Sequence, residues 1–270
     1  QFLKYTPGSG LTAGQPFGKP HFFVFGAINM KNNLTVGLVV ADDTEYAPIV
    51  GLKNLALQPA PFCGRAGHRF TLQQGAKTLT VYSVHSGIGK VNAATAAAHL
   101  LENGCRVLLN YGLSGGVGKL PRNSFALGTA FIEHDFDLTC LGRPRGQKPG
   151  QPLFCTASEA LNRCFLAAEP GLYAGPMACG DCFVSSNKLR DWLREDLKVI
   201  CCDMETGAIA SAANLYGVPF ATLRQVSDDA GDDAAADYSA HAEPEQVTLF
   251  ELFLKLLGQL FSVPELWEDE

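Results

Sequence analysis

The chain has 270 residues, of which 47% are hydrophobic and 18% charged, so it is long enough to bury the core of one large α/β domain. Its net charge is −6 and it contains no run of Lys or Arg, which gives no electrostatic support for binding nucleic acid or an anionic membrane surface. No apolar run reaches the ~18 residues that a membrane-spanning helix needs.

The first 33 residues are rich in Gly and Pro and then briefly apolar, in the stretch "FFVFGAI". That stretch is too short and too late for the apolar region of a signal peptide. We interpret residues 1–33 as a leader or tag-like extension, with Met30 as a candidate natural start, and residues 34–270 as the folded domain.

From Leu34 onward, apolar strand-like runs alternate with helical patterns. The expected elements, in chain order, are a strand at 34–40, a strand at 77–87, a helix at 89–104, a strand at 106–112, a strand at 128–138, a loop at 144–152, a helix at 158–169, a strand at 197–203, a helix at 204–217, a strand at 219–228 and a helix at 245–261. This alternation predicts an α/β fold, a single domain whose central, mostly parallel, twisted mixed sheet is flanked by helices.

Polar residues occur where several of these strands should end. In parallel sheets, ligands collect beyond the carboxyl ends of the strands. The polar residues that fall there are Glu45, Ser86, Ser114, Glu205, Arg224 and Asp228. We therefore expect a polar ligand at this edge of the sheet.

The carboxylates of Glu205 and Asp228 each follow an apolar strand that should be buried on both faces. An unpaired carboxylate in such a place costs several kcal/mol, which favours a function. The alternative is structural, because Arg224 could neutralise one of them as an ion pair.

Glu45 lies in the stretch "VVADDTEYAPI", directly after the first strand. Here too a structural interpretation is available: Asp42, Asp43 and Glu45 could supply the N-cap and first-turn charges of a helix.

Two Gly-rich stretches, "SGIGKVNAA" at 86–94 and "YGLSGG" at 111–116, read as turns that either approach a ligand or simply reverse the chain. Neither has the spacing of a phosphate-binding loop or a dinucleotide fingerprint. The nine cysteines show no disulfide-scaffold spacing and read as reduced thiols. "CGDC" at 179–182 lacks a second ligand pair for a metal, so we expect its cysteines to pack in a strand.

Taken together, the stretches "SGIGKVNAA", "NYGLSGG", "HDFDLTCLGRPRGQKPGQ", "CGDCF", "DMETGAIASAANLYGVPF" and "LRQVSD" follow one another in a characteristic order and spacing. In this the chain resembles the 5′-methylthioadenosine/S-adenosylhomocysteine nucleosidases of the purine nucleoside phosphorylase superfamily. The resemblance covers about residues 34–260.

The resemblance implies hydrolysis of the N-glycosidic bond of adenine nucleosides through an oxocarbenium-like ribose. Asp228 matches the general acid that protonates the purine N7, which requires burial to raise its pKa. Glu45 matches the carboxylate that activates the attacking water. Ser227 matches the serine that orients the acid.

The resemblance also implies a set of substrate-binding residues. Glu205 matches the acceptor of the ribose hydroxyls, Met204 packs on the sugar, and Arg224 lies near the carboxylates. Phe183 matches the aromatic ring that stacks on adenine, and the backbone of Val184 reads the purine edge. The expected set is completed by Ile88, Ser114 and Asp42.

Three positions depart from the family pattern. Asp42 stands beside the pocket for the 5′ group, where the family usually has Met; Leu113 replaces a usual Ser; and Cys182 replaces a small residue. These departures leave the adenine-ribose machinery intact and leave the preferred 5′ group open. Asp42 keeps a futalosine-type nucleosidase, with a larger 5′ group, as an alternative.

Two other functions are considered. A phosphorylase of the same fold needs cations for phosphate, typically with an Arg before the second Gly-rich stretch, and "LLNYGLSGG" has none. His85 and Lys90 flank the first Gly-rich stretch, but we interpret them as strand and helix-face residues, so water is the favoured nucleophile. A non-catalytic nucleoside sensor would need neither Glu45 nor Asp228.

The implied chemistry needs no cofactor and no metal. The expected partners are a small-molecule nucleoside and, by resemblance, a second copy of the chain, whose loop 134–147 closes the 5′ pocket. No nucleic acid or membrane partner is expected, and the predicted location is cytoplasmic.

Overall fold

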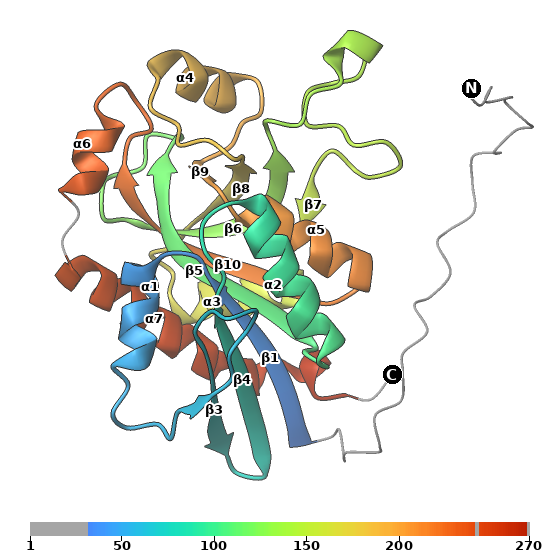
Figure 1. Cartoon of the computed structure of the whole chain (residues 1–270), viewed down its shortest axis with the longest axis vertical. Coiled ribbons are helices and arrows are strands. Elements are labelled where there is room, and N and C mark those ends of the chain that lie inside the picture. Colours follow the sequence, from blue (N-terminus) through green and yellow to red (C-terminus); the bar gives the residue numbers. More distant parts are fainter. Residues whose placement is uncertain (1–31, 241–242, 269–270) are drawn as a thin grey trace, which may run out of the picture.

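The structure is a computed structural model that describes residues 32–240 and 243–268, shown in Figure 1. The predicted leader, including the candidate start at Met30, lies almost wholly outside the described residues. The strands are β1 (Asn33–Val40), β2 (Gln58–Pro59), β3 (Gly67–Gln74), β4 (Lys77–His85), β5 (Val107–Gly116), β6 (Phe125–Glu133), β7 (Cys155–Thr156), β8 (Tyr173–Cys179), β9 (Cys201–Asp203) and β10 (Phe220–Asp228).

Helices cover the sheet on both faces. The α-helices are α1 (Asp43–Val50), α2 (Lys90–Glu102), α3 (Glu159–Ala168), α4 (Asn187–Glu195), α5 (Thr206–Tyr216), α6 (Ala234–Ser239) and α7 (Glu243–Gln259). Short 3₁₀ turns follow at η2 (Thr139–Leu141), η3 (Leu260–Ser262) and η4 (Pro264–Leu266). None of the helices in the described residues is long and apolar enough to cross a membrane.

The strands form one mixed sheet in the order β10-β6-β8-β9-β5-β1-β4-β3-β2, with β7 added beside β6. Parallel pairing joins β4, β1, β5 and β10 into one group and β6, β8 and β9 into another. The two groups are joined by the antiparallel pairs β10–β6 and β5–β9, and β3 pairs antiparallel with β4. The predicted α/β class with a mixed sheet is confirmed. Because β10 pairs with β5 as well as with β6, the strands β5, β10, β6, β8 and β9 close into a ring, which the sequence did not predict.

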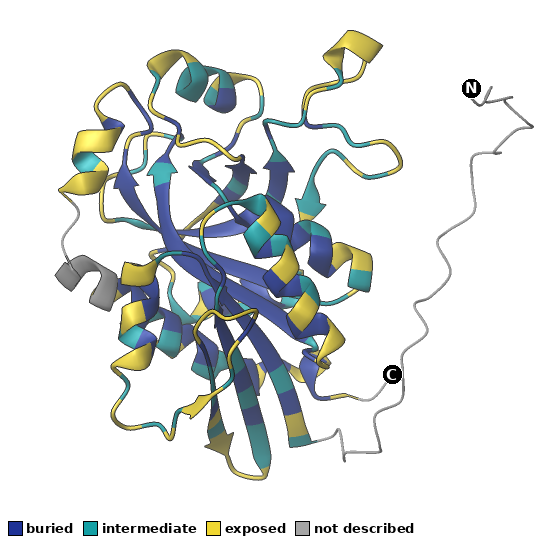
Figure 2. Ribbon diagram, viewed as in Figure 1, coloured by how far each residue is buried: buried dark blue, intermediate teal, exposed yellow. Residues whose placement is uncertain are grey.

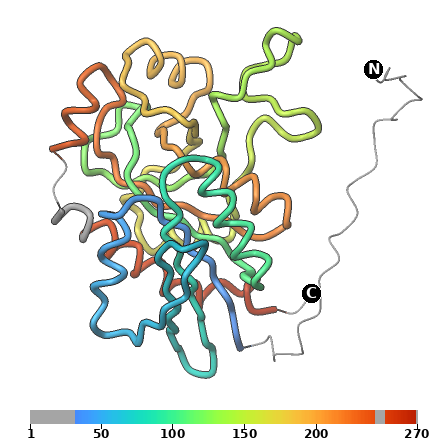
Figure 3. Tube along the Cα trace, viewed as in Figure 1, coloured from blue at the N-terminus to red at the C-terminus, as the bar shows by residue number. Residues whose placement is uncertain are grey.

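The apolar core lies in layers above and below the central strands. Residues of α1, α3 and α7 pack on one cluster, and residues of α2 and α5 pack on another. Figure 2 shows buried residues along the central strands and exposed ones on the outer faces of the helices. Figure 3 traces how β1, β5 and β10, separated by long stretches of chain, run beside one another.

The second Gly-rich stretch is a correction to the sequence interpretation. Residues 111–116 do not form a turn; they continue β5 to Gly116, four residues beyond the predicted end. Pairing with β10 and β9 keeps this segment extended, since Gly115 lies opposite both Asp228 and Cys202. Two other predicted strands end early, at His85 and at Glu133.

Several elements have no clear signal in the sequence. The helix α1 contains Pro48 and β8 contains Pro176, so neither shows the usual signal of its element, and α4 is a short, mostly charged helix with only a few apolar residues on one face. The prediction for "CGDC" is half right. Cys179 is buried in β8, whereas Cys182 is exposed in the segment between β8 and α4.

Candidate active site

Glu45 occupies the first turn of α1 and is buried at the edge of the sheet. The helix starts there because Asp42 is its N-cap: its Oδ1 accepts a hydrogen bond of 2.8 Å from the backbone N–H of Thr44. Tyr111 of β5 donates a hydrogen bond of 2.8 Å to the carbonyl of Glu45. The structural interpretation of Asp42 as a cap is therefore confirmed, and the cap aims the Glu45 side chain inward.

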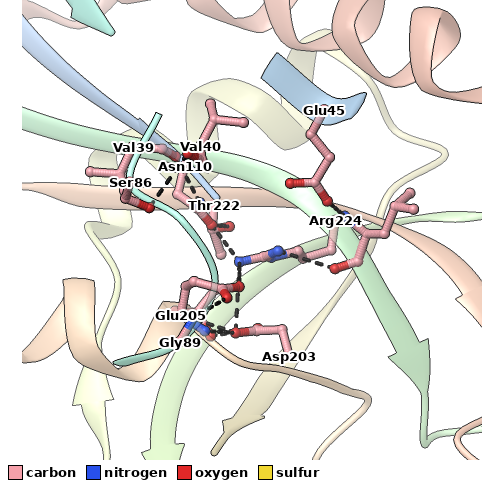
Figure 4. A network of polar contacts seen from close by, with 12 residues as sticks. Val39, Val40, Glu45, Ser86, Gly89, Asn110, Asp203, Glu205, Thr222 and Arg224 are labelled. Carbon is pink, nitrogen blue, oxygen red and sulfur yellow. Dashed lines mark hydrogen bonds and ion pairs between the residues drawn. The ribbon is translucent and has the colours of Figure 1, made fainter. Parts of the chain in front are cut away.

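Arg224 of β10 is fully buried and held at both ends of its guanidinium group. Its Nη2 donates to Oδ1 of Asn110 at 2.6 Å, and its Nη1 donates to the carbonyl of Leu113 at 3.1 Å. The same Nη2 lies 3.7 Å from Oδ1 of Asp203 and 3.9 Å from Oε2 of Glu205. Figure 4 shows this network, with Glu45 on one side of Arg224 and Glu205 on the other.

Gly112, in the middle of the buried strand β5, stands where there is no room for a side chain. A Cβ atom at this position would lie 2.6 Å from Nη1 of Arg224 and 2.8 Å from Oε1 of Glu45. Any side chain would separate the two groups or push them out of place. The Gly-rich sequence of β5 thus allows close approach of charged groups.

Glu205 follows β9 and stands at the N-cap position of α5, where its side chain makes no capping hydrogen bond. Its Oε1 accepts a hydrogen bond of 2.9 Å from the backbone N–H of Gly89, in the first Gly-rich stretch. Gly89 has φ of +100°, a conformation that favours glycine. Asp203 fixes the backbone here, because its Oδ1 accepts 2.8 Å hydrogen bonds from the N–H groups of Glu205 and Thr206.

Burial has a strong effect on both glutamates. It raises the pKa of Glu45 to about 7, against the opposing effects of Arg224 and the N–H of Leu113. It raises the pKa of Glu205 to about 7 as well, again opposed by Arg224. Near neutral pH each carboxyl group is therefore close to its pKa, as suits a general base.

Asp228 ends β10 directly after a β-bulge at Ser227, where the register with β5 shifts. Its Oδ2 accepts a 2.7 Å hydrogen bond from Ser227, and its Oδ1 accepts one of 2.8 Å from the N–H of Ala230. Burial raises the pKa of Asp228, although these two hydrogen bonds oppose the shift. The predicted contact between Ser227 and the acid is present.

The segment after β8 brings an aromatic ring to the site. Phe183 is 44% exposed, and its ring lies edge-on to that of Tyr238 in α6, with centroids 5.6 Å apart. Val184 beside it is buried. Burial, together with the charges of Asp42, Glu45, Glu205 and Asp228, raises the pKa of Tyr238 to about 12. The Tyr238 hydroxyl therefore experiences the negative charge of all four carboxylates.

The other predicted residues lie around this centre. Met204 is half-buried between Asp203 and Glu205. Ser114 is buried in β5, and Ile88 is exposed in the Gly-rich turn before α2. The eleven predicted site residues lie in the last residues of, or in the segments directly after, β1, β4, β5, β8, β9 and β10.

Three residues of this site have no place in the sequence prediction: Asn110, Asp203 and Tyr238. Two of them have a signal in the sequence. Asn110 is a polar residue within the apolar run "VLLNYG", and Asp203 is a capping-type residue shortly before a helix that begins with Thr206. Tyr238 lies in a polar, Ala-rich stretch, and its position depends on how α6 packs against β10.

Comparison with known proteins gives a consistent result. The family model described as the phosphorylase superfamily matches residues 35–257. The chain is 28% identical over 233 residues to the aminodeoxyfutalosine nucleosidase of Helicobacter pylori (strain ATCC 700392 / 26695), covering 83% of this chain and 98% of that protein. It is 33% identical over 186 residues to the 5′-methylthioadenosine/S-adenosylhomocysteine nucleosidase of Halalkalibacterium halodurans, covering 65% of this chain and 79% of that protein.

Among solved structures, the chain is similar to the S-adenosylhomocysteine nucleosidase of Streptococcus pyogenes in complex with 5-methylthiotubericidin. The TM-score is 0.76 at 26% sequence identity, and the alignment covers 87% of this chain and 99% of the other.

Proposed function

We propose that this chain, which belongs to the phosphorylase superfamily, is a nucleosidase that hydrolyses the N-glycosidic bond of 5′-methylthioadenosine and S-adenosylhomocysteine. The products are adenine and the corresponding thioribose. Glu45 and Asp228 are the proposed catalytic residues.

The observation that carries the proposal is that the carboxyl groups of Glu45, from α1, and Asp228, from β10, both lie against the same strand, β5. A Cβ at Gly112 would lie 2.8 Å from the Glu45 carboxylate, and a Cβ at Gly115 would lie 3.1 Å from that of Asp228. Both carboxyl groups have a raised pKa, and together they provide a base and an acid for one glycosidic bond.

The proposed reaction uses both groups. Asp228 donates its proton to N7 of adenine as the C1′–N9 bond breaks and its electron pair goes to the base. Water adds its oxygen to C1′ and gives a proton to Glu45. The ribose hydroxyls donate to Glu205, and Phe183 offers an exposed ring on which the purine can stack.

The environment of the cations supports water rather than phosphate as the nucleophile. The Arg224 guanidinium is bound to Asn110 and the carbonyl of Leu113. The Lys90 ammonium lies 2.6 Å from Oδ1 of Asp135. His85 and Lys90 belong to β4 and α2, as the sequence predicts. Both cations are engaged by protein oxygens, and a phosphate dianion would have to displace them.

A second substrate class is also proposed as a candidate. The aminodeoxyfutalosine nucleosidase of Helicobacter pylori aligns with this chain over 98% of its own length. Its sequence identity, 28%, is close to the 33% of the 5′-methylthioadenosine/S-adenosylhomocysteine nucleosidase. Asp42 would present a carboxylate beside a larger, polar 5′ group.

The test is product analysis with 5′-methylthioadenosine, S-adenosylhomocysteine and aminodeoxyfutalosine, each with and without phosphate. We expect adenine and a free reducing sugar at the same rate in both buffers. Formation of a ribose 1-phosphate, with turnover that requires phosphate, would replace the hydrolase proposal with a phosphorylase. The substrate with the highest kcat/KM identifies the preferred 5′ group.

Two further expectations belong to this proposal. All nine cysteines are free thiols, which fits a reducing compartment such as the cytoplasm. By the family resemblance we expect a homodimer, in which the loop 134–147 reaches the partner's site. Light scattering on the purified chain measures the oligomeric state directly, and a monomer with full activity would contradict this expectation.

A further inference from the structure

Lys90, the first residue of α2, is the centre of an ionic cluster beside the site. Its Nζ lies 2.6 Å from Oδ1 of Asp135 and 3.3 Å from Oε2 of Glu133, at the end of β6. The Lys90 side chain is 17% exposed and the carboxylates 26% and 12% exposed. These are mostly buried ion pairs, for which the loss of one partner is costly.

The backbone of Lys90 is bound as well. Its N–H donates a 2.7 Å hydrogen bond to Oδ1 of Asp181, in the segment between β8 and α4. The N–H of Asp181 in turn donates a 2.9 Å hydrogen bond to Oδ2 of Asp135. Lys90, Asp181 and Asp135 therefore form a closed ring of interactions, which joins three segments that are far apart in the sequence.

Two of these segments carry proposed substrate-binding groups. Gly89, directly before Lys90, donates the N–H that binds Oε1 of Glu205 at 2.9 Å. Phe183 stands two residues after Asp181. This closed set of interactions links the turn that binds Glu205, the proposed ribose-binding residue, to the segment that carries Phe183.

From this geometry we infer that Lys90 is a positioning residue: it sets the distance between the group that binds ribose and the group that stacks on the base. This inference rests on the proposed nucleosidase function. A nucleoside must meet both groups at once, and a displacement of about 1 Å far from the reacting atoms can cost on the order of 10²-fold in rate. In this role Lys90 acts through its contacts with Asp135, Glu133 and Asp181.

Lys90→Met is the first test variant. It removes the ammonium and leaves Asp135 without its cation, so we expect kcat/KM to fall about 10- to 10²-fold. Lys90→Arg keeps the charge and should restore most of the loss. The matched control is Lys255→Met, which removes a lysine whose Nζ lies 2.8 Å from Glu169 on the outside of α7 and α3. The control should keep wild-type kinetics.

A double-mutant cycle separates positioning from general destabilisation. If Lys90 acts through Gly89 on Glu205, then Lys90→Met should cost much less in a Glu205→Ala background, which lacks the acceptor for the Gly89 N–H, than in the wild type. Equal losses in both backgrounds would overturn the inference. An unchanged kcat/KM for Lys90→Met, when the wild-type chain is active, would overturn it too. Inactivity of the wild-type chain on every nucleoside would instead overturn the proposed function.

Asp181→Ala keeps the inference testable if Lys90→Met does not fold. Asp181 is exposed, so its loss should leave folding intact while it opens the ring on the side of Phe183. We expect a lower kcat/KM for the nucleoside, again with a smaller loss in the Glu205→Ala background. Wild-type kinetics for Asp181→Ala would show that the ring does not set the geometry of the site.

Discussion

Glu45 in α1 and Leu113 in β5 are joined by a hydrogen bond of 2.6 Å, from the backbone N–H of Leu113 to Oε1 of Glu45. The two residues are 68 positions apart in the chain. This bond fixes one carboxylate oxygen against the sheet, so the other oxygen can take a proton from water without the side chain turning.

The variant Glu45→Gln tests this arrangement. The amide oxygen can still accept the hydrogen bond from Leu113, but the group can no longer accept a proton. We expect turnover to fall by at least the ~10²–10⁴-fold typical of general acid–base catalysis, with nucleoside affinity largely kept. Single-turnover rates and calorimetric binding of an adenine-based inhibitor give the two quantities. A variant with a near-native rate would assign the base to another group.

The pH dependence of kcat/KM should reflect the same carboxylate. Because burial raises the pKa of Glu45 to about 7, the base is ionised above that pH and protonated below it. We therefore expect kcat/KM to fall as the pH drops below about 7, with one proton taken up. A profile that stays flat down to pH 5 would show that no group with this pKa must be ionised for activity.

Folding stability should show the opposite trend. Glu45 has an ordinary pKa of 4.5 and a pKa of about 7 in the folded state, so the folded chain binds its proton more tightly. The contribution of Glu45 to stability is therefore full below pH 4.5 and is lost as the pH rises through 7. Glu45→Gln should be more stable than the wild type at pH 8, by up to about 3 kcal/mol, and similar to it at pH 4.5. Denaturant unfolding at both pH values measures this, and a pH-independent difference would contradict it.

The sequence predicts much of the fold because its central strands are long and apolar and its helices α2 and α5 are rich in Ala. It predicts the site in part because charged residues are rare at the ends of buried strands, so Glu205, Arg224 and Asp228 are conspicuous.

What the sequence could not predict depends on contacts between distant segments. Whether "YGLSGG" is a turn or a strand is decided by the pairing of Gly115 with Asp228 and Cys202. The ring of strands arises because β10 pairs on both sides. The ring of Tyr238 meets that of Phe183 only because α6 packs against β10, and no local pattern encodes that.

Asp42 has two separable contributions, and two variants distinguish them. Asp42→Asn keeps a side-chain cap for α1 but removes the charge, whereas Asp42→Met removes both. If the charge shapes the 5′ pocket, both variants should favour 5′-methylthioadenosine over substrates with polar 5′ groups, since a thioether prefers an apolar wall. Only Asp42→Met should also lose about 1 kcal/mol of stability. The ratio of kcat/KM values for the two substrate types decides this, and an unchanged ratio in both variants would limit Asp42 to the role of a cap.

Asp228→Asn tests the proposed acid, because an Asn can donate a hydrogen bond to the purine but cannot deliver a full proton to N7. Its amide can still keep the contacts with Ser227 and Ala230 only in part, since just one of its two terminal atoms is an acceptor. We expect the rate to fall about 10²–10⁴-fold or more, and the affinity for adenine-based inhibitors to fall less, because stacking on Phe183 remains.

The loss in Asp228→Asn should also depend on the leaving group. A nucleoside whose base departs easily without protonation needs little help from an acid, so its hydrolysis should be partly spared in the variant. Hydrolysis of 5′-methylthioadenosine and of such an activated nucleoside, by the wild type and by Asp228→Asn, gives the comparison. Equal losses on the two substrates would mean that Asp228 only positions the ligand and that the proton comes from another group. A large loss on 5′-methylthioadenosine with a small one on the activated nucleoside would identify Asp228 as the proton donor, because only a donor's absence is compensated by a better leaving group.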